Sequence, residues 1–418
     1  MNQTVKVSDV FKVSRVLPLN YTQRSHVDDV FIDTIAGDNH IIIYGSSKQG
    51  KTSLHKYHLL PDDSINISCQ NNWTITDLQL SILKKIGFQP ISNTSNTSDN
   101  GLKISVKFPF VKVGGEFKDS ETENRKAWEI NPSDVNDVID IINKVEFDKY
   151  IVLEDFHYLP VKTQIDFSIV LKAYHELSSI SFIIVGVWLE NDRLTVYNGD
   201  LLGRVNSVNA DEWKDEDLHK LIEKSESLLN IKFNLNFKNT LIKECNGNVF
   251  LVQEVCRSVC EKNNIFNTLS SPIEIGQNNS VKDEIKEKLC HQNSRYYKFI
   301  SEFSKGFGST KLDLYKWILK IILTIDKETL LNSLYINILR DEIKKEHPKS
   351  SEITRSKLHQ FLKKSIELQS RVGIQPIIFE YDENKKRIKI VDKYFILWRE
   401  NNNKEDLLEQ MGSNDDDE

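Results

Sequence analysis

The sequence contains few cysteines, and their spacing argues against a metal or disulfide framework. Five cysteines occur among 418 residues, in an odd and scattered set: Cys69, Cys245, Cys256, Cys260 and Cys290. Cys256 and Cys260 lie one helical turn apart, but no second pair completes a zinc site. We therefore predict buried free thiols.

Long apolar runs are also missing, and no segment is long enough to span a bilayer. Residues 1–8 lack the apolar core of a secretory signal. We expect a cytoplasmic protein with no membrane partner. The hydrophobic content of 39% and charged content of 28% are typical of a globular chain, and the length suits two or three domains.

Charge is unevenly distributed along the chain. The net charge of −6 combines about −8 in residues 1–280, +8 in residues 281–400 and −6 in residues 401–418. A basic carboxy-terminal portion suggests a polyanionic partner, although solvated helices often carry a similar excess. The acidic segment 401–418 is predicted to be a disordered tail.

The most informative stretch is a buried strand at 41–44 followed by a glycine-rich loop. Gly45 to Thr52 matches the phosphate-binding pattern G-x-x-x-x-G-K-[ST] in full. Such loops direct successive backbone N–H groups at phosphate oxygens, and a helix amino terminus adds its positive end. The predicted nucleotide-binding residues are Gly45, Ser46, Ser47, Lys48, Gln49, Gly50, Lys51, Thr52 and Ser53. Lys51 is expected to reach the outer phosphates and Thr52 to bind Mg²⁺, so we predict that ATP is bound with magnesium.

An apolar strand at 150–153 ends in two acids, as an ATPase requires opposite its phosphate loop. Glu154 is assigned to the magnesium side and Asp155 to the attacking water, so both join Lys51 as catalytic candidates. The inverted order leaves open which acid is catalytic. For His157 we favour a partly buried histidine with satisfied hydrogen bonds over one that orients Asp155. Asn191 or Arg193 is a candidate phosphate sensor, with a plain polar loop as the alternative.

The remaining predictions concern domain organisation. Residues 1–210 are expected to form the α/β nucleotide-binding domain with a parallel sheet, and 88–128 a β-hairpin insertion at an edge. Residues 211–280 are expected to form a helical lid. Helices at 312–325, 328–346 and 352–369, followed by a hairpin at 376–391, predict a winged-helix-like module within 281–400. Arg355, Lys357 and residues 385–387 would then face DNA or, equally, a protein.

These motifs occur in the order seen in AAA+ ATPases. From Gly45 to the Gly247-Asn248 turn, the chain most resembles the STAND and origin-recognition-type branch, including the archaeal-type ATPases of prokaryotes. In that branch the lid turn usually reads Gly-x-Pro, whereas Val249 replaces the proline here. The resemblance implies an ATP-driven switch that forms homo-oligomers, with Arg204 acting as an arginine finger on the next protomer.

The resemblance also implies a role in bacterial antiviral defence. Because the sequence has no nuclease, protease or deaminase signature, any destructive chemistry would have to come from a separate effector protein. The leading hypothesis is therefore a switch or assembly ATPase. The inverted order of Glu154 and Asp155 is consistent with slow ATP hydrolysis. One alternative is a DNA-binding loader of the origin-recognition or transposition-regulator kind. Another is a nucleotide-held scaffold that does not hydrolyse ATP.

Overall fold

The computed structural model describes residues 4–11, 16–90, 96–98, 101–107, 110–113, 116–119 and 127–412. The chain forms two compact units, which are treated separately below. The sheet unit comprises residues Gln23–Gly45 and Gly50–Glu212. The helical unit comprises Met1–Thr22, Ser46–Gln49 and Trp213–Glu418. None of the helices in these described stretches has the length and apolar character needed to cross a membrane.

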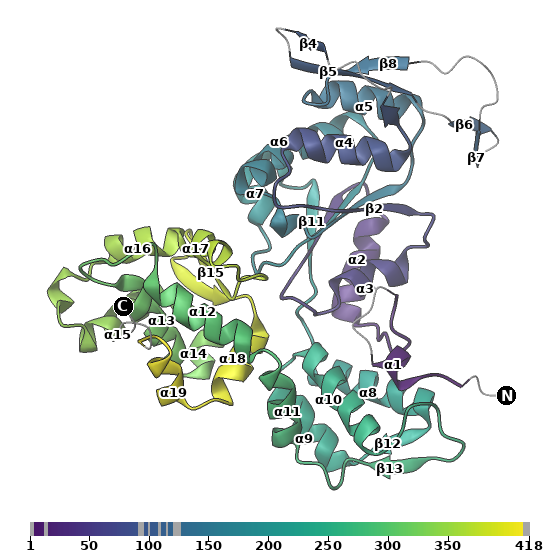
Figure 1. The fold of residues 1–418 in the computed structure, drawn as a ribbon. Coiled ribbons are helices and arrows are strands. Elements are labelled where there is room, and N and C mark those ends of the chain that lie inside the picture. Colours follow the sequence, from purple (N-terminus) through teal and green to yellow (C-terminus); the bar gives the residue numbers. More distant parts are fainter. Residues whose placement is uncertain are drawn as a thin grey trace. The chain divides into compact units, whose positions relative to one another are not determined.

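The sheet unit is built on five parallel strands in the order β11-β1-β10-β9-β2 (Figure 1). They are β1 (His40–Tyr44), β2 (Ser64–Ser68), β9 (Tyr150–Glu154), β10 (Phe182–Val185) and β11 (Val205–Asn209). Along β1, Ile42 packs into one hydrophobic cluster, whereas Ile41 and Ile43 pack into another. Side chains alternate between the faces of a strand, so both faces of this sheet are covered. The predicted parallel α/β fold is confirmed.

Helices cover the two faces of the sheet. They are α2 (Ser25–Ile35), α3 (Lys51–His58), α4 (Ile75–Ile86), α5 (Val135–Lys144), α6 (Val161–Leu177) and α7 (Arg193–Tyr197), with 3-10 turns η1 (Phe156–Tyr158) and η2 (Gly199–Leu201). Local sequence fixes several of their ends. Thr74 and Asp77 form a reciprocal capping box at α4, which satisfies backbone N–H groups that have no partner within the helix.

Six short strands form the predicted insertion, all paired antiparallel. They are β3 (Gln89–Pro90), β4 (Asn96–Ser98), β5 (Gly101–Lys107), β6 (Phe110–Val113), β7 (Glu116–Asp119) and β8 (Ala127–Ile130). β6 and β7 pair as a hairpin, and residues 114–115 between them lie outside the described part of the chain. Val106 of β5 and Ile130 of β8 are buried in the core below the insertion.

The predicted lid, residues 211–280, contains α8 (Asp215–Leu229), α9 (Leu235–Cys245) and α10 (Val249–Lys262), with a parallel pair β12 (Ile231–Phe233) and β13 (Ile273–Ile275). Two helices outside these bounds, α1 (Val7–Val10) and α11 (Val281–Cys290), pack against it in the helical unit. Four of the five thiols are buried, as predicted, whereas Cys290 at the end of α11 is exposed. Burial raises the pKa of the Cys260 thiol to about 12, which leaves it protonated and unreactive.

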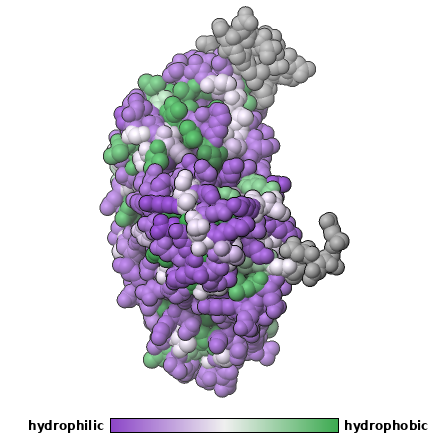
Figure 2. All heavy atoms as spheres, turned by 90° about the vertical axis from the view of Figure 1, so that its left-hand side faces the viewer, coloured by the Kyte–Doolittle hydropathy of each residue, from purple (hydrophilic) through white to green (hydrophobic). Residues whose placement is uncertain are grey.

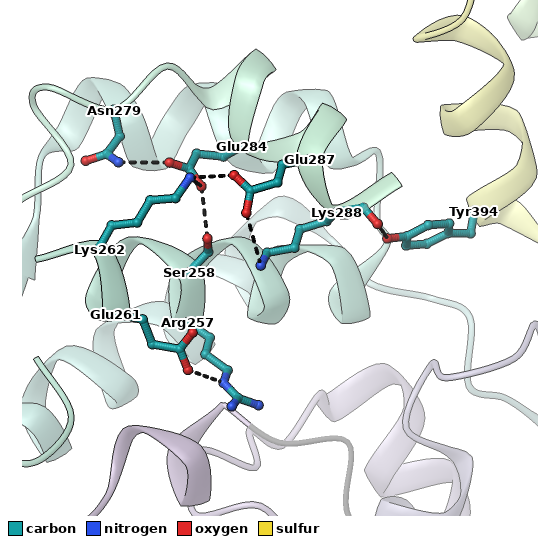
Figure 3. A network of polar contacts seen from close by, with 9 residues as sticks. All are labelled: Arg257, Ser258, Glu261, Lys262, Asn279, Glu284, Glu287, Lys288 and Tyr394. Atoms are coloured by element: carbon teal, nitrogen blue, oxygen red, sulfur yellow. Dashed lines mark hydrogen bonds and ion pairs between the residues drawn. The ribbon is translucent and has the colours of Figure 1, made fainter. Parts of the chain in front are cut away.

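A polar network centred on Glu284 joins α10 to α11 (Figure 3). This carboxylate is 4% exposed and accepts hydrogen bonds from Ser258 (3.1 Å), Lys262 (2.8 Å) and Asn279 (2.9 Å). A buried carboxylate is tolerated only when its oxygens are satisfied in this way. The network therefore fixes how the last lid helix continues into α11.

The carboxy-terminal part of the helical unit contains helices and a three-stranded antiparallel sheet, β14-β16-β15. Its elements are α12 (Asn293–Lys305), α13 (Leu314–Thr324), α14 (Lys327–Leu331), β14 (Leu334–Tyr335), α15 (Ile336–Glu346), η3 (Ser350–Glu352), α16 (Arg355–Lys363), α17 (Ser365–Arg371), β15 (Phe379–Asp382), β16 (Arg387–Ile390), α18 (Lys393–Glu400) and α19 (Lys404–Glu409). The predicted order of helices followed by a hairpin is present.

Three details differ from the sequence-based expectation. The helix expected over 328–346 is divided, because Ser333 adopts φ 79° and Leu334 pairs with Ile388 of the hairpin. The helix expected over 352–369 is likewise divided into α16 and α17. Within the segment expected to be a disordered tail, α19 forms and buries Leu407 in the hydrophobic core.

Candidate nucleotide-binding site

The loop between β1 and α3 has a backbone that requires both of its glycines. Gly45 has φ 140°, and a Cβ there would come within 3.0 Å of the Asp211 carboxylate. Gly50 caps α3 in the left-handed region, at φ 91°. Glycine adopts these conformations without the steric penalty of other residues. The sequence therefore shapes a turn that leads directly into the amino terminus of α3.

The crest of the loop, Ser46–Gln49, belongs to the helical unit. Ser46 and Gln49 are buried, and the carbonyl oxygen of Gln49 accepts a hydrogen bond of 3.1 Å from the Trp213 indole. The Lys48 ammonium group lies 4.0 Å from the centre of the Phe250 ring. The predicted site residue Ser47, between Ser46 and Lys48 in the sequence, begins a turn.

Lys51, in the first turn of α3, is only 7% exposed. Its ammonium group donates a hydrogen bond of 3.0 Å to the carbonyl oxygen of Gly45, so the side chain folds back across its own loop. Burial lowers the pKa of Lys51 to about 8, although the charges of Asp211, Glu154 and Asp155 act in the opposite direction. A buried cation surrounded by carboxylates at a helix amino terminus is a site that suits a polyanion accompanied by a metal ion.

Glu154, at the end of β9, is held by two side chains of α3. Its Oε2 accepts a hydrogen bond of 3.1 Å from the Thr52 hydroxyl, and its Oε1 lies 2.7 Å from Nε2 of His55. Burial raises the pKa of Glu154, but the hydrogen bonds from His55 and Thr52 and the charge of His55 outweigh it, and the net shift is downward. The carboxylate is therefore ionised and oriented toward Thr52. This is the arrangement needed if Thr52 and Glu154 are to bind one magnesium ion together.

Asp155 follows in a strained conformation. Its φ of 57° lies in the left-handed region, which is costly for a residue other than glycine. Unlike Glu154 it is exposed, and partial burial together with the neighbouring Glu154 charge raises the pKa of its carboxyl group. The two acids thus have distinct surroundings, since Glu154 is held by side chains of α3 and Asp155 is exposed.

His157 differs from the sequence-based expectation. We favoured a histidine whose hydrogen bonds are satisfied, but both ring nitrogens are buried without a hydrogen-bond partner among the described residues. The ring lies against that of Tyr158, with centroids 4.2 Å apart and planes tilted by 43°. Burial and the charges of Lys51 and Arg193 lower the pKa of His157 to about 3, so the ring is neutral.

The remaining candidates lie beyond the ends of β10 and at the start of β11. Asn191 is exposed, and the Arg193 guanidinium lies over the ring of Trp188 at 5.4 Å. Arg204 donates hydrogen bonds to the carboxylate of Glu176 at 2.7 Å and to the carbonyl oxygen of Asp200. Arg204 is thus engaged within its own chain.

Comparison with known proteins bears on the fold. No protein-family model and no curated protein matches the sequence. A Walker-type ATPase of Pyrococcus abyssi is similar in structure, with a TM-score of 0.53 and 12% identity over 94% of this chain and 99% of that one. The chain has the fold of a Walker-type ATPase. The predicted α/β fold with a phosphate loop is thereby confirmed.

Two further solved structures are similar to this chain at lower TM-scores. One is the Orc1 protein of Aeropyrum pernix in complex with DNA, with a TM-score of 0.44 and 10% identity over 97% of this chain and 96% of that one. The other is Cdc6p of Pyrobaculum aerophilum, with a TM-score of 0.40 and 10% identity over 97% and 99% of the respective chains.

Two residues in the site of this Walker-type ATPase fold are not among those that the sequence predicts. His55 lies three positions after Thr52, a spacing that places both side chains on one face of α3, and this signal was available. Asp211 follows β11, the strand beside β1, and it reaches the loop only because those two strands are neighbours. That adjacency is a property of the sheet and has no local sequence signal.

Proposed function

We propose that the protein binds ATP with Mg²⁺ at the loop between β1 and α3 and hydrolyses it. The observation that carries the proposal is the approach of the Thr52 hydroxyl to the Glu154 carboxylate, at 3.1 Å, beside the buried Lys51. These groups come from different elements, and together they supply a cation for phosphate and two oxygen ligands for a metal.

The residues present fit a magnesium ion. Thr52 and Glu154 would hold it, directly or through water, and a bound Mg²⁺ would neutralise charge that develops on the phosphate oxygens. His55 supports this arrangement, because its 2.7 Å contact occupies one carboxylate oxygen and leaves the other facing Thr52. His55 is therefore a positioning residue in this proposal.

Asp155 is the proposed general base for the attacking water. A base must be exposed to its water and must have a pKa that allows it to accept a proton, and Asp155 is exposed with a raised pKa. Glu154 meets both conditions less well than Asp155, because its carboxylate is held by Thr52 and His55. The geometry therefore supports Asp155 in the catalytic role and Glu154 in the magnesium role.

We further propose that ATP binding controls self-assembly. Val161, Ile165 and Ile169 are exposed at four-residue spacing along α6, which gives that helix an apolar strip. The face drawn in Figure 2 is mostly hydrophilic, with hydrophobic residues in small groups. Release of Arg204 from Glu176 would free its guanidinium for a neighbouring protomer, as an arginine finger requires.

Binding of a fluorescent ATP analogue in the presence of Mg²⁺ tests the primary proposal. Lys51→Ala should abolish measurable binding because it removes the charge-assisted contacts to phosphate. Lys84→Ala, the same change on an exposed residue of α4, is the matched control and should bind like the wild type. Equal affinity of wild type and Lys51→Ala would refute binding at this loop.

DNA binding by the carboxy-terminal module is a second candidate. Exposed basic residues at α16 and the hairpin favour it, including Arg355, Lys364 and Lys385. Pairing weakens one predicted contact, because Arg387 lies 3.3 Å from Asp382, and the nearby Lys389 of the hairpin is only 9% exposed. The available positive charge is thus smaller than the sequence suggests.

A further inference from the structure

His157 has a partly buried ring whose two nitrogens receive no hydrogen bond from the described part of the chain. Neither Nδ1 nor Nε2 has a partner there, although both atoms are inaccessible. An unpaired buried polar group of this kind destabilises the folded state, so most buried polar groups are paired. Such an exception calls for a ligand or a catalytic role as its explanation.

The place of the ring points to the phosphate site. His157 lies in η1, directly after the two acids at the carboxyl end of β9. Ligands of open parallel sheets bind beyond the carboxyl ends of the strands. The charges of Lys51 and Arg193 both act on this ring, so it lies in the field of the phosphate-loop lysine and of the polar segment after β10.

The charges around the ring indicate the chemical class of its partner. Two cations act on His157, and their field favours a negatively charged group over a metal cation. They also keep the imidazole neutral, so one nitrogen carries a hydrogen and donates while the other accepts. A neutral donor beside cations suits a phosphate oxygen.

We propose that His157 is a catalytic residue that donates a hydrogen bond to the terminal phosphate of bound ATP. This inference rests on the proposed ATP-binding function and adds to it a residue that distinguishes ATP from ADP. Both ring nitrogens are buried and have no hydrogen-bond partner among the described residues. A half-turn of the ring exchanges its nitrogens with the ring carbons, and bound ATP then gives one nitrogen a charged acceptor, a gain that contributes to preference for the triphosphate.

The test compares affinities for adenylyl-imidodiphosphate, an ATP analogue resistant to hydrolysis, and for ADP, by titration calorimetry with Mg²⁺. His157→Phe keeps an aromatic ring beside Tyr158 but removes both nitrogens. We expect the analogue to bind about 10- to 100-fold more weakly, the range for a hydrogen bond to a charged group, with ADP affinity unchanged. His157→Gln, which restores a donor, should recover part of the loss.

A second measurement separates this role from a structural one. Because the nitrogens have no partner to lose among the described residues, His157→Phe should leave the thermal unfolding midpoint of the nucleotide-free protein unchanged or raised. His157→Met provides the same apolar change if the phenylalanine variant does not fold. His291→Phe, at an exposed position, is the control and should alter neither affinity nor midpoint.

Equal weakening of the analogue and ADP, or no weakening of either, would overturn the proposed role of His157. A lowered midpoint in both apolar variants would also overturn it, because it would show a structural partner. Failure of the wild-type protein to bind either nucleotide would instead refute the proposed function itself. The two failures are therefore distinguishable.

Discussion

The buried ammonium group of Lys51 should make ATP affinity depend on pH. Burial lowers the pKa of Lys51 to about 8 against the opposing charges of Asp211, Glu154 and Asp155. Phosphate oxygens bind the ammonium form, because the neutral amine provides no charge-assisted hydrogen bond. We therefore expect ATP to bind the protonated fraction of the protein, which decreases as the pH rises through this pKa.

The magnitude follows from the protonated fraction. With a pKa of about 8, that fraction is roughly three quarters at pH 7.5 and about 3% at pH 9.5. The apparent Kd varies inversely with the competent fraction, so ATP should bind about 25-fold more weakly at pH 9.5 than at pH 7.5. Near the pKa, each binding event should take up roughly half a proton.

Titration calorimetry with ATP and Mg²⁺ in two buffers of different ionisation enthalpy measures both quantities. Lys51→Arg should bind more weakly but with no dependence on pH, because its guanidinium stays charged throughout this range. Lys84→Met, at an exposed position of α4, should keep the wild-type pH dependence. Equal wild-type affinity at the two pH values, without proton uptake, would refute the assignment of a titrating Lys51 to phosphate binding.

Three further predictions concern the metal site, the lid and the carboxy-terminal module. Glu154→Gln should raise the Mg²⁺ concentration needed for half-maximal ATP binding at least about tenfold. His55→Phe should raise that concentration less, because Thr52 still contacts the Glu154 carboxylate. Unchanged Mg²⁺ titrations would contradict both expectations. Glu284→Ala should lower the unfolding free energy of the lid helices by about 3 kcal/mol, since its three partners lose a buried acceptor, and hydrogen exchange of α10 and α11 checks this. Anisotropy of a labelled duplex over a salt series should show steeply salt-dependent binding that reversal of residues 385–387 to Glu reduces for all sequences alike. Flat curves for the wild type would leave the module as a protein-contact surface.

The parts of the fold that depend on local pattern could be predicted from the sequence. The strand 41–44 and its loop were predictable because buried strands have continuous β-branched runs and the loop motif is long. The division of the helix expected over 328–346 was not predictable. Its apolar spacing continues through Ser333, and only pairing of Leu334 with the distant Ile388 forces the break.

The site residues that belong to local sequence motifs were likewise predictable. Lys51, Thr52 and Glu154 stand in recognisable motifs, and the structure brings them together. The state of His157 was not predictable, since whether a ring nitrogen finds a partner depends on every element packed around it. The neutralisation of Arg387 by Asp382 across the hairpin likewise depends on strand register.

The most direct test of the account is ATP binding and phosphate release measured on the same preparations of three proteins. We expect the wild type to bind and hydrolyse ATP in the presence of Mg²⁺. Lys51→Ala should do neither, and Asp155→Asn should bind ATP with near wild-type affinity but release no phosphate, because it loses only the proposed base. Phosphate release by Asp155→Asn at the wild-type rate, or binding by Lys51→Ala, would contradict the account.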